Sequence, residues 1–417
     1  MRRRTFLQLS AATAGAGLLL VPQQPRAQVK AKVLIVGGGF AGASCAMSLR
    51  RLGPGIDVTL VDPDERYVTC PMSNSVLVGL RDLKSISVPR HGLERAGVKY
   101  VRGRITSIDA QRRRAKFAGG VLAYDRLVMA PGIRFLWGRP QGYDPGAVQL
   151  MPHAWQAGAQ TEILAAQLRA MRDGGVMAIS VPLGPMRCPP GPYERASLIA
   201  GYLKQSKPRS KVLIFDSNNR FPRQDIFTDA WNLLYPGMIE WIPVVEDGAV
   251  VRVAPAEQVL YTAHGAHRVD VANIIPPQAP GLLAAQVGLA SDHGWCPIKP
   301  DTFESALIPH LHVIGDACIA DPMPKAASAA ITQAKQCALA IIAALEGREP
   351  PAPEFESVCY SMLARDNALS IHGRFRLTDG IIQQVPEPQD ESSARSAQEA
   401  LNAEDWYKGI VTDSFGT

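Results

Sequence analysis

The chain has 417 residues, of which 47% are hydrophobic and 20% are charged, and its formal net charge is +6 at pH 7. This is an ordinary globular composition with ample apolar material for a core, and the length suggests two or three domains. No run reaches the roughly 20 apolar residues that a membrane span needs, and no basic patch with interleaved aromatic residues occurs. We therefore expect neither stable membrane insertion nor a nucleic-acid partner.

Residues 1–27 are typical of an export signal. Three arginines precede an apolar run rich in Gly, Ala and Leu, and a polar stretch ends at Ala27. The pair Arg3-Arg4 before Thr-Phe-Leu fits the twin-arginine type, which carries folded proteins and so suits a cofactor inserted before export. Removing the segment takes away four arginines and lowers the formal net charge from +6 to +2. We predict a periplasmic protein; a disordered basic tail is the alternative.

The segment after the signal has the order strand, glycine turn, helix, strand. Residues 32–36 (KVLIV) form the first predicted strand, GGGFAG the turn, a helix runs to about Leu52, and residues 57–62 (DVTLVD) form the second strand. An acidic residue ends the second strand, twenty residues past the last glycine of the turn. Together these features are the fingerprint of a dinucleotide site in its required context.

Each residue of this fingerprint has a predicted role. Gly37 permits the tight turn, and Gly39 lets the backbone approach a pyrophosphate at the helix N-terminus. Gly42 allows the helix to pack closely on the strand. Asp62 is placed to accept a hydrogen bond from a ribose hydroxyl.

Two later segments are predicted to complete this nucleotide site. Residues 98–130 alternate as short strands and end in RLVMAPG, where Gly132 is a candidate cofactor-binding residue. Residues 311–316 (LHVIGD) form a strand that ends in Gly315-Asp316 and precedes a helix at about 326–345. In flavoproteins with two nucleotide folds, such a segment returns to the first domain and its aspartate binds the flavin's ribityl chain. We therefore predict an FAD site shared by the two ends of the chain.

A second strand–loop–helix–strand unit lacks the glycines. Its predicted strands are residues 175–181 and 211–216, its helix is 194–204, and the loop between reads PLGPMRCPPGPYE. Proline has no N–H to give a phosphate, so this loop is a poor pyrophosphate cradle. Asp216 stands where a ribose-binding acid would sit, which is contrary evidence. We do not expect a nicotinamide nucleotide to be the working substrate.

Seven cysteines occur along the chain, and an odd number leaves at least one unpaired or otherwise bonded. No CxxC, CxxCH or zinc-like spacing is present, so we predict no thioredoxin motif, no haem attachment and no metal site on this chain. Cys188 lies beside Arg187 with Arg195 nearby, and cations favour the reactive thiolate; a structural disulfide is the alternative. Cys45 and Cys337 lie in apolar helices and are expected in the core.

Several unusual motifs resemble one family, the flavoprotein subunit of flavocytochrome c sulfide dehydrogenase, including its relatives in sulfur-oxidation (Sox) systems. The resemblance runs from about residue 32 to 416. It rests on VLIVGGGFAG, YVTCPMSN (67–74), MPHAWQAG (151–158), RCPPGPYERAS (187–197), IIPPQ (274–278), GWCP (294–297), VIGDACIADPMPK (313–325) and CYSMLA (359–364).

The resemblance implies an α/β fold with two Rossmann-like dinucleotide-binding domains of the glutathione-reductase-like type and a C-terminal α+β interface domain. We divide the chain accordingly. The expected parts are the signal peptide 1–27, the FAD-binding domain 28–147 and 271–345, the degenerate second nucleotide fold 148–270, and the interface domain 346–417. The Pro/Glu-rich stretch 346–356 is expected to be a linker, and the polar stretch 383–399 a loop.

The resemblance also implies site residues. Cys188 and Cys359 correspond to a redox-active pair beside the flavin, and Glu194 to an acid that moves protons there. Cys70 corresponds to a cysteine bonded covalently to the flavin, although Pro71 replaces the larger residue expected after it. Lys325 is a candidate cation for the reduced flavin, with solvated surface as its alternative.

The remaining notable residues are less specific. We expect His153 to be packed or hydrogen-bonded and not a base, and Cys318 to be structural. A structural role is also favoured for Cys296. Trp406 and Tyr407 are open between shielding the flavin, lining a partner surface and packing in the core.

The expected function is FAD-dependent sulfide oxidation. Hydrosulfide attacks a Cys188–Cys359 disulfide, giving a persulfide and a thiolate, and electrons leave through FAD to a separate c-type cytochrome subunit. One alternative is a sulfide:quinone oxidoreductase, which would need a C-terminal membrane helix for which WYKGIVTDSFGT is too short and mixed. The other is a Sox-associated flavoprotein that maintains a sulfur-carrier protein without turning over free sulfide. The same cysteine pair would serve both.

Overall fold

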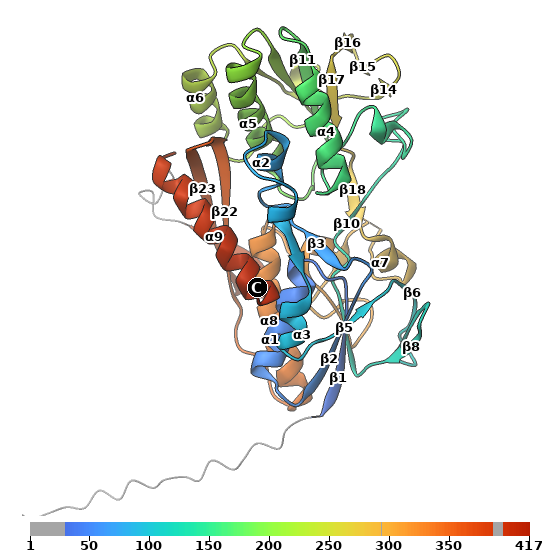
Figure 1. Cartoon of the computed structure of the whole chain (residues 1–417). Coiled ribbons are helices and arrows are strands. Elements are labelled where there is room, and N and C mark those ends of the chain that lie inside the picture. The colour runs from blue at the N-terminus through green and yellow to red at the C-terminus, as the bar shows by residue number, and fades with distance from the viewer. Residues whose placement is uncertain (1–29, 293, 387–394) are drawn as a thin grey trace, which may run out of the picture.

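The computed structural model describes residues 30–292, 294–386 and 395–417, so the predicted export signal lies outside the described residues. Two parallel sheets with their helices form the two halves of Figure 1, and a C-terminal hairpin and helix lie along one side of both. The structure therefore has the α/β fold class that the two nucleotide-binding patterns predicted.

The first sheet is parallel and joins the two ends of the chain. Its order is β20 (Leu311–Val313), β9 (Arg126–Met129), β1 (Ala31–Val36), β2 (Ile56–Asp62) and β5 (Lys99–Arg102). These strands read as apolar runs because helices and loops bury them. The pairing of β20 with β9 brings the turn after β20 to the edge where the glycine turn after β1 lies.

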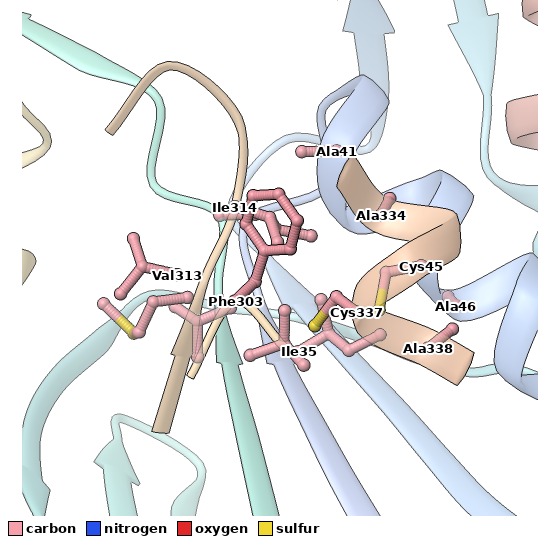
Figure 2. Close-up of a cluster of buried hydrophobic side chains, with 14 of the residues drawn as sticks. Ile35, Ala41, Cys45, Ala46, Phe303, Val313, Ile314, Ala334, Cys337 and Ala338 are labelled. Atoms are coloured by element: carbon pink, nitrogen blue, oxygen red, sulfur yellow. The ribbon is translucent and has the colours of Figure 1, made fainter. Parts of the chain in front are cut away.

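Helices α1 (Phe40–Leu52) and α8 (Ala327–Leu345) pack against each other over this sheet. Figure 2 shows their contact with Ile35 and Phe303, where small side chains such as Ala46 and Ala338 let the two backbones approach. Cys45 and Cys337 are fully buried here, which confirms them as core residues.

Within the described residues, α8 is the one helix that is long and apolar enough to cross a membrane by length and composition. The sequence analysis predicted this helix but did not single out its apolar character. Of its most apolar 18-residue window, 67% is buried inside the protein. Burial against α1 and the sheet accounts for this apolar character.

The second sheet is also parallel and belongs to the degenerate unit. Its order is β13 (Ile239–Ile242), β12 (Lys211–Asp216), β11 (Val176–Val181) and β17 (Val271–Ile274), and its helices are α4 (Ala159–Ala170), α5 (Gly191–Ser206) and α6 (Gln224–Leu234). Helix α5 begins at Gly191, three residues before the predicted start, so Glu194 lies in its first turn.

The C-terminal segment is more regular than the sequence suggested. It forms β22 (Glu354–Ala364), β23 (Asn367–Thr378), β24 (Ile381–Val385) and the helix α9 (Ala397–Phe415). The predicted loop at 383–399 was therefore wrong at both ends, while residues 387–394 lie outside the described residues. Small residues such as Ala400 and Ala403 form much of the buried face of α9, which weakens its apolar pattern.

Short elements connect these parts. They are β3 (Arg66–Val68), α2 (Ser73–Leu77), β4 (Ser87–Pro89), α3 (His91–Arg95), β6 (Ile105–Asp109), β7 (Arg114–Phe117), β8 (Gly120–Ala123), β10 (Ile133–Phe135), β14 (Arg252–Ala254), β15 (Val259–Tyr261), β16 (Ala266–Arg268), β18 (Gln278–Pro280), α7 (Leu282–Gln286), β19 (Cys296–Pro297) and β21 (Cys318–Ile319).

Gly42 in α1 is a test of this packing. A Cβ at this position would lie 1.9 Å from the carbonyl oxygen of Gly37, so Gly42→Ala must shift backbone. We expect it to lower the free energy of unfolding by about 2 kcal/mol or more and to weaken cofactor retention, measured by urea denaturation and flavin content. Gly409→Ala in α9 is the control, because its Cβ would meet nothing within 4 Å. It should stabilise slightly, and equal effects of the two changes would contradict this account.

Candidate functional site

A cavity of about 720 Å³ lies where the two nucleotide folds and the C-terminal segment meet. Both ends of the first fold contribute to it, as do the proline-rich loop before α5, strand β22 and helix α9. Most of the predicted site residues line this cavity: Gly37, Gly39, Asp62, Cys70, Gly132, Cys188, Glu194, Gly315, Asp316 and Cys359. Gly42 is not among the lining residues, because its role is helix packing.

The glycine turn after β1 leaves no room for side chains. Gly37 has φ +102°, and a Cβ there would lie 2.2 Å from the carbonyl oxygen of Ala130. The Asp62 carboxylate accepts a hydrogen bond from the Gly38 N–H at 2.7 Å and pairs with Arg90 at 2.9 Å. Asp62 thus holds the turn while still bordering the cavity.

Arg90 also stabilises the glycine turn, a role that the sequence did not predict. It is almost fully buried and its guanidinium donates to the carbonyl of Gly38 as well as to Asp62. It also lies over the ring of Tyr67, 5.8 Å from the centroid. A single arginine after a short edge strand carries no local sequence signal, so only the tertiary fold exposes this role.

The returning segment supplies the other half of the FAD site. Gly315 has φ +76° and lies under Ala41, so a Cβ there would come within 2.9 Å of that side chain. The Asp316 side chain makes no hydrogen bond to any described residue, and burial raises its pKa while Arg187 and Lys325 oppose the shift. An acceptor that faces the cavity without a protein partner fits a hydroxyl-bearing ligand. The glycine cradle and this free carboxyl together fit FAD.

Lys325 has a different place from the predicted one. Its ammonium donates to the backbone carbonyls of Asp316 and Cys318, both at 2.9 Å, and lies 3.9 Å from the centroid of the Trp295 ring. It is not among the residues that line the cavity. Lys325 therefore stabilises the loop that carries Asp316 through hydrogen bonds to its backbone.

Cys318 and Cys296 lie beside the same loop, where they are paired residues of the short strands β21 and β19. Both are buried, and the Cys318 thiol donates to the Gly315 carbonyl at 3.2 Å. These contacts favour the structural role expected for both cysteines.

The sulfur end of the cavity brings Cys188 and Cys359 together with Glu194 and Cys70. Cys188 has a positive φ of 54° and its N–H donates to the Lys325 carbonyl at 2.7 Å, so a tight turn fixes its sulfur. Cys359 comes from β22. All seven cysteines are free thiols in this structure. The Cys188–Cys359 bond therefore remains a prediction, although both residues open on one cavity.

The expected activation of Cys188 by cations was wrong. Burial raises the pKa of the Cys188 thiol well above its usual value, the Glu194 carboxylate raises it further, and Arg187 opposes both weakly. The Arg195 guanidinium is held by Asn74 at 2.9 Å and by Asn273 at 2.7 Å. It serves as a buried structural cation, not as a partner of the thiolate.

Glu194 has the properties of a proton-transfer group. Burial raises its pKa to about 7, while a hydrogen bond from Asn74 Nδ2 at 3.1 Å and one from the Met362 N–H at 3.4 Å limit the shift. A carboxyl group that titrates near neutrality can both accept and return a proton. Asn74 was part of a motif but had no predicted role.

Of the aromatic and histidine residues singled out in the sequence, one borders the cavity and the others are packed in the protein interior. His153 is neutral because burial lowers its pKa to about 3, and its Nδ1 accepts the Trp155 N–H at 3.0 Å, so it is the packed histidine expected. Trp406 borders the cavity and packs on Tyr360 at 5.5 Å between centroids. Tyr407 is buried, with its hydroxyl 3.0 Å from Thr69 Oγ1.

The second nucleotide fold has lost its ribose acceptor. Asp216 is fully buried and accepts hydrogen bonds from Tyr193 at 2.6 Å and Trp241 at 2.9 Å through one oxygen. Its other oxygen accepts from the backbone and side-chain nitrogens of Asn218 at 3.0 and 2.8 Å. Both oxygens are therefore engaged within the protein. Unlike Asp62, whose oxygens also have protein partners, Asp216 is fully buried and does not line the cavity, which answers the contrary evidence noted from the sequence.

This fold and site define a flavin-dependent oxidoreductase that binds FAD. Residues 31–154 match the pyridine nucleotide-disulphide oxidoreductase family model. Residues 161–276 match the central domain of the sulfide dehydrogenase [flavocytochrome c] flavoprotein chain, and residues 351–415 match the flavin-binding domain of flavocytochrome c sulphide dehydrogenase. The chain belongs to the family of flavocytochrome c sulfide dehydrogenase flavoprotein chains.

Known proteins agree with this assignment. A sulfide dehydrogenase [flavocytochrome c] flavoprotein chain from Chlorobaculum thiosulfatiphilum is 60% identical over 45 residues, which are 11% of this chain and 94% of that sequence. The mitochondrial sulfide:quinone oxidoreductase of Mus musculus is 22% identical over 79% of this chain and 74% of its own. The sulfide:quinone oxidoreductase structure from Aquifex aeolicus superposes with a TM-score of 0.74 at 17% identity, covering 93% of each chain, and shows the shared fold.

The Asn74–Glu194 hydrogen bond gives a pH-dependent prediction. Asn74→Ala removes a donor that stabilises the carboxylate, so the pKa of Glu194 should rise above about 7. Any step that needs ionised Glu194 should then require a higher pH, and the acidic limb of the pH–rate profile should move upward by up to about one unit. Stopped-flow flavin reduction across pH measures this. Asn402→Ala on α9 is the control, and a matching shift there would contradict the assignment.

Proposed function

We propose that this chain is the FAD-bearing subunit of a sulfide dehydrogenase that passes electrons from sulfide to a c-type cytochrome. The observation that carries the proposal is the shared cavity, in which Cys188, Cys359, Glu194 and Asp316 all take part. The engaged oxygens of Asp216 support a sulfur electron donor over a nicotinamide nucleotide.

The proposed chemistry begins with the Cys188–Cys359 disulfide as the resting form. Hydrosulfide attacks one sulfur, the S–S bond breaks, and the products are a cysteine persulfide and a cysteine thiolate. Two electrons thereby move from the sulfide sulfur to the cysteine pair. Glu194, with its pKa raised to about 7 by burial, accepts the proton released at the persulfide. Bound FAD supplies a two-electron acceptor beside the cysteine pair.

Electron exit needs a second redox centre, because the sequence has no CxxCH haem attachment motif. A c-type cytochrome subunit supplies one, in line with the family to which the chain belongs. We place the pair in the periplasm, on the basis of the twin-arginine signal at residues 1–27.

The covalent flavin bond at Cys70 is a further part of the proposal. Cys70 lines the cavity in the turn between β3 and α2, and the Ser73 hydroxyl donates to its carbonyl at 2.7 Å, which fixes the turn. Pro71 is compatible with this turn, since its own backbone carbonyl accepts a hydrogen bond from the Thr69 hydroxyl at 2.9 Å. The unusual residue after Cys70 thus does not remove it from the site.

The likeness to sulfide:quinone oxidoreductases makes that activity the second candidate. The C-terminal helix α9 packs on β23 and α1. Phe415 at its end lies in the core, stacked near Tyr67 at 5.5 Å. Maintenance of a sulfur-carrier protein would use the same cysteines and is distinguished by experiment.

Cys188→Ser tests the disulfide mechanism. The variant should keep FAD, because the change is confined to the sulfur atom and the backbone bond from Cys188 to the Lys325 carbonyl remains, but anaerobic sulfide should bleach its flavin at least about a thousandfold more slowly than in the wild type. Stopped-flow absorbance with and without cytochrome c measures the rate. Bleaching at the wild-type rate would refute the role of Cys188. A wild-type protein that sulfide does not reduce would favour the maintenance function instead.

Cys70→Ala tests the covalent bond. After acid precipitation, flavin should stay with the wild-type protein and be released from the variant, because a thioether survives denaturation and non-covalent contacts do not. Absorbance of the supernatant and pellet measures the partition. Flavin in the wild-type supernatant would show that Cys70 forms no bond.

A further inference from the structure

The two cysteines of the proposed pair have different surroundings. The Cys359 sulfur lies 3.4 Å from Ser328 Oγ, and Ser328 Oγ lies 3.0 Å from Ser357 Oγ. Burial raises the pKa of the Cys359 thiol, and hydrogen bonds from Ser328 and Ser357 lower it. Two hydroxyl groups can therefore donate to this sulfur when it carries a negative charge.

The position of Ser328 adds to this effect. It is in the first turn of α8, whose N-cap is Ala326. The positive end of a helix dipole favours a thiolate near it. Cys359 reaches this end because β22 packs along α8.

Cys188 also lies before a helix N-terminus, that of α5, so the helix dipole does not distinguish the two sulfurs, but Cys188 lacks the hydroxyl pair. Its sulfur has no side-chain hydrogen bond among the described residues. The Glu194 carboxylate raises the pKa of both thiols, so the hydroxyl groups at Cys359 are the difference between them. Arg187 opposes this shift at Cys188, but its guanidinium is tied to the Trp155 carbonyl. A thiolate is thus harder to form at Cys188 than at Cys359.

We propose that Ser328 is a positioning residue that sets the polarity of the disulfide, so that hydrosulfide bonds to Cys188 and Cys359 leaves as the thiolate. In thiol–disulfide exchange, the sulfur that leaves faster is the one whose thiol has the lower pKa. The new S–S bond joins the sulfide sulfur to Cys188 Sγ, and the electron pair of the broken bond remains on Cys359 Sγ. The persulfide proton passes to Glu194. This inference rests on the proposed function and adds which sulfur is attacked.

Two measurements on the holoenzyme test it. In the first, the fully reduced protein is alkylated with iodoacetamide across pH, and peptide mass spectrometry follows each cysteine. Cys359 should react with a lower midpoint pH than Cys188, and Ser328→Ala should raise the Cys359 midpoint by up to about one unit. Ser328→Thr should restore it, and Ser206→Ala on the exposed end of α5 should leave it unchanged. An unmoved Cys359 midpoint in Ser328→Ala would overturn the proposal.

In the second, one equivalent of sulfide is added anaerobically and quenched within milliseconds by acid and alkylating reagent. The alkylated persulfide should be found on the Cys188 peptide, and Ser328→Ala should lower its excess over the Cys359 persulfide about five- to tenfold. Persulfide mainly on Cys359 would overturn the polarity and leave sulfide oxidation intact. Persulfide on neither cysteine, with the Ser328-dependent midpoint shift retained, would instead refute the proposed function.

Discussion

The pairing of β20 with β9 is the contact on which the site depends. It joins a strand near residue 311 to a sheet that begins at residue 31, and so places Gly315 and Asp316 opposite the glycine turn. The close approach of α1 and α8 is the condition for this pairing, because α8 follows β20 and must pack over the same sheet. Small side chains between the two helices make that approach possible. The FAD site is therefore assembled from parts that no single local segment of the chain contains.

Desolvation then determines the chemistry at the sulfur end. Burial raises the pKa of Glu194 to about 7 and that of both cysteine thiols above their usual values. The neighbouring arginines had suggested that the Cys188 thiol would be activated. Burial instead disfavours the thiolate. It suits a disulfide, which carries no charge until it is opened. When the disulfide opens, hydrogen-bond donors stabilise the negative charge on one of its two sulfurs. Among the described residues, these donors lie near Cys359.

How far the sequence predicted the structure depends on how local each signal was. The elements around Gly37 and Asp62 were predicted nearly to the residue because their strands are continuous apolar runs and the turn needs glycine. Helix α9 was missed because alanines form much of its buried face, and its apolar anchor, Phe415, is at its very end. Arg90, Asn74 and Ser328 were missed because each acts through a partner distant in the chain, and a single sequence contains no record of such pairs. The roles of Cys188 and Cys359 came from resemblance.

The second nucleotide fold shows how the electron donor changed while the architecture stayed. Helix α5 begins with Pro190 at its N-cap and Pro192 soon after, positions where a missing N–H costs the helix nothing. The same substitutions leave fewer N–H groups for a pyrophosphate, and Asp216 has turned inward to Tyr193 and Trp241. The first turn of α5 instead presents Glu194 to the cavity, with Cys188 in the loop before it. A helix N-terminus that could hold a dinucleotide thus holds Glu194, with a pKa raised to about 7, and the sulfur of Cys188 beside the cavity.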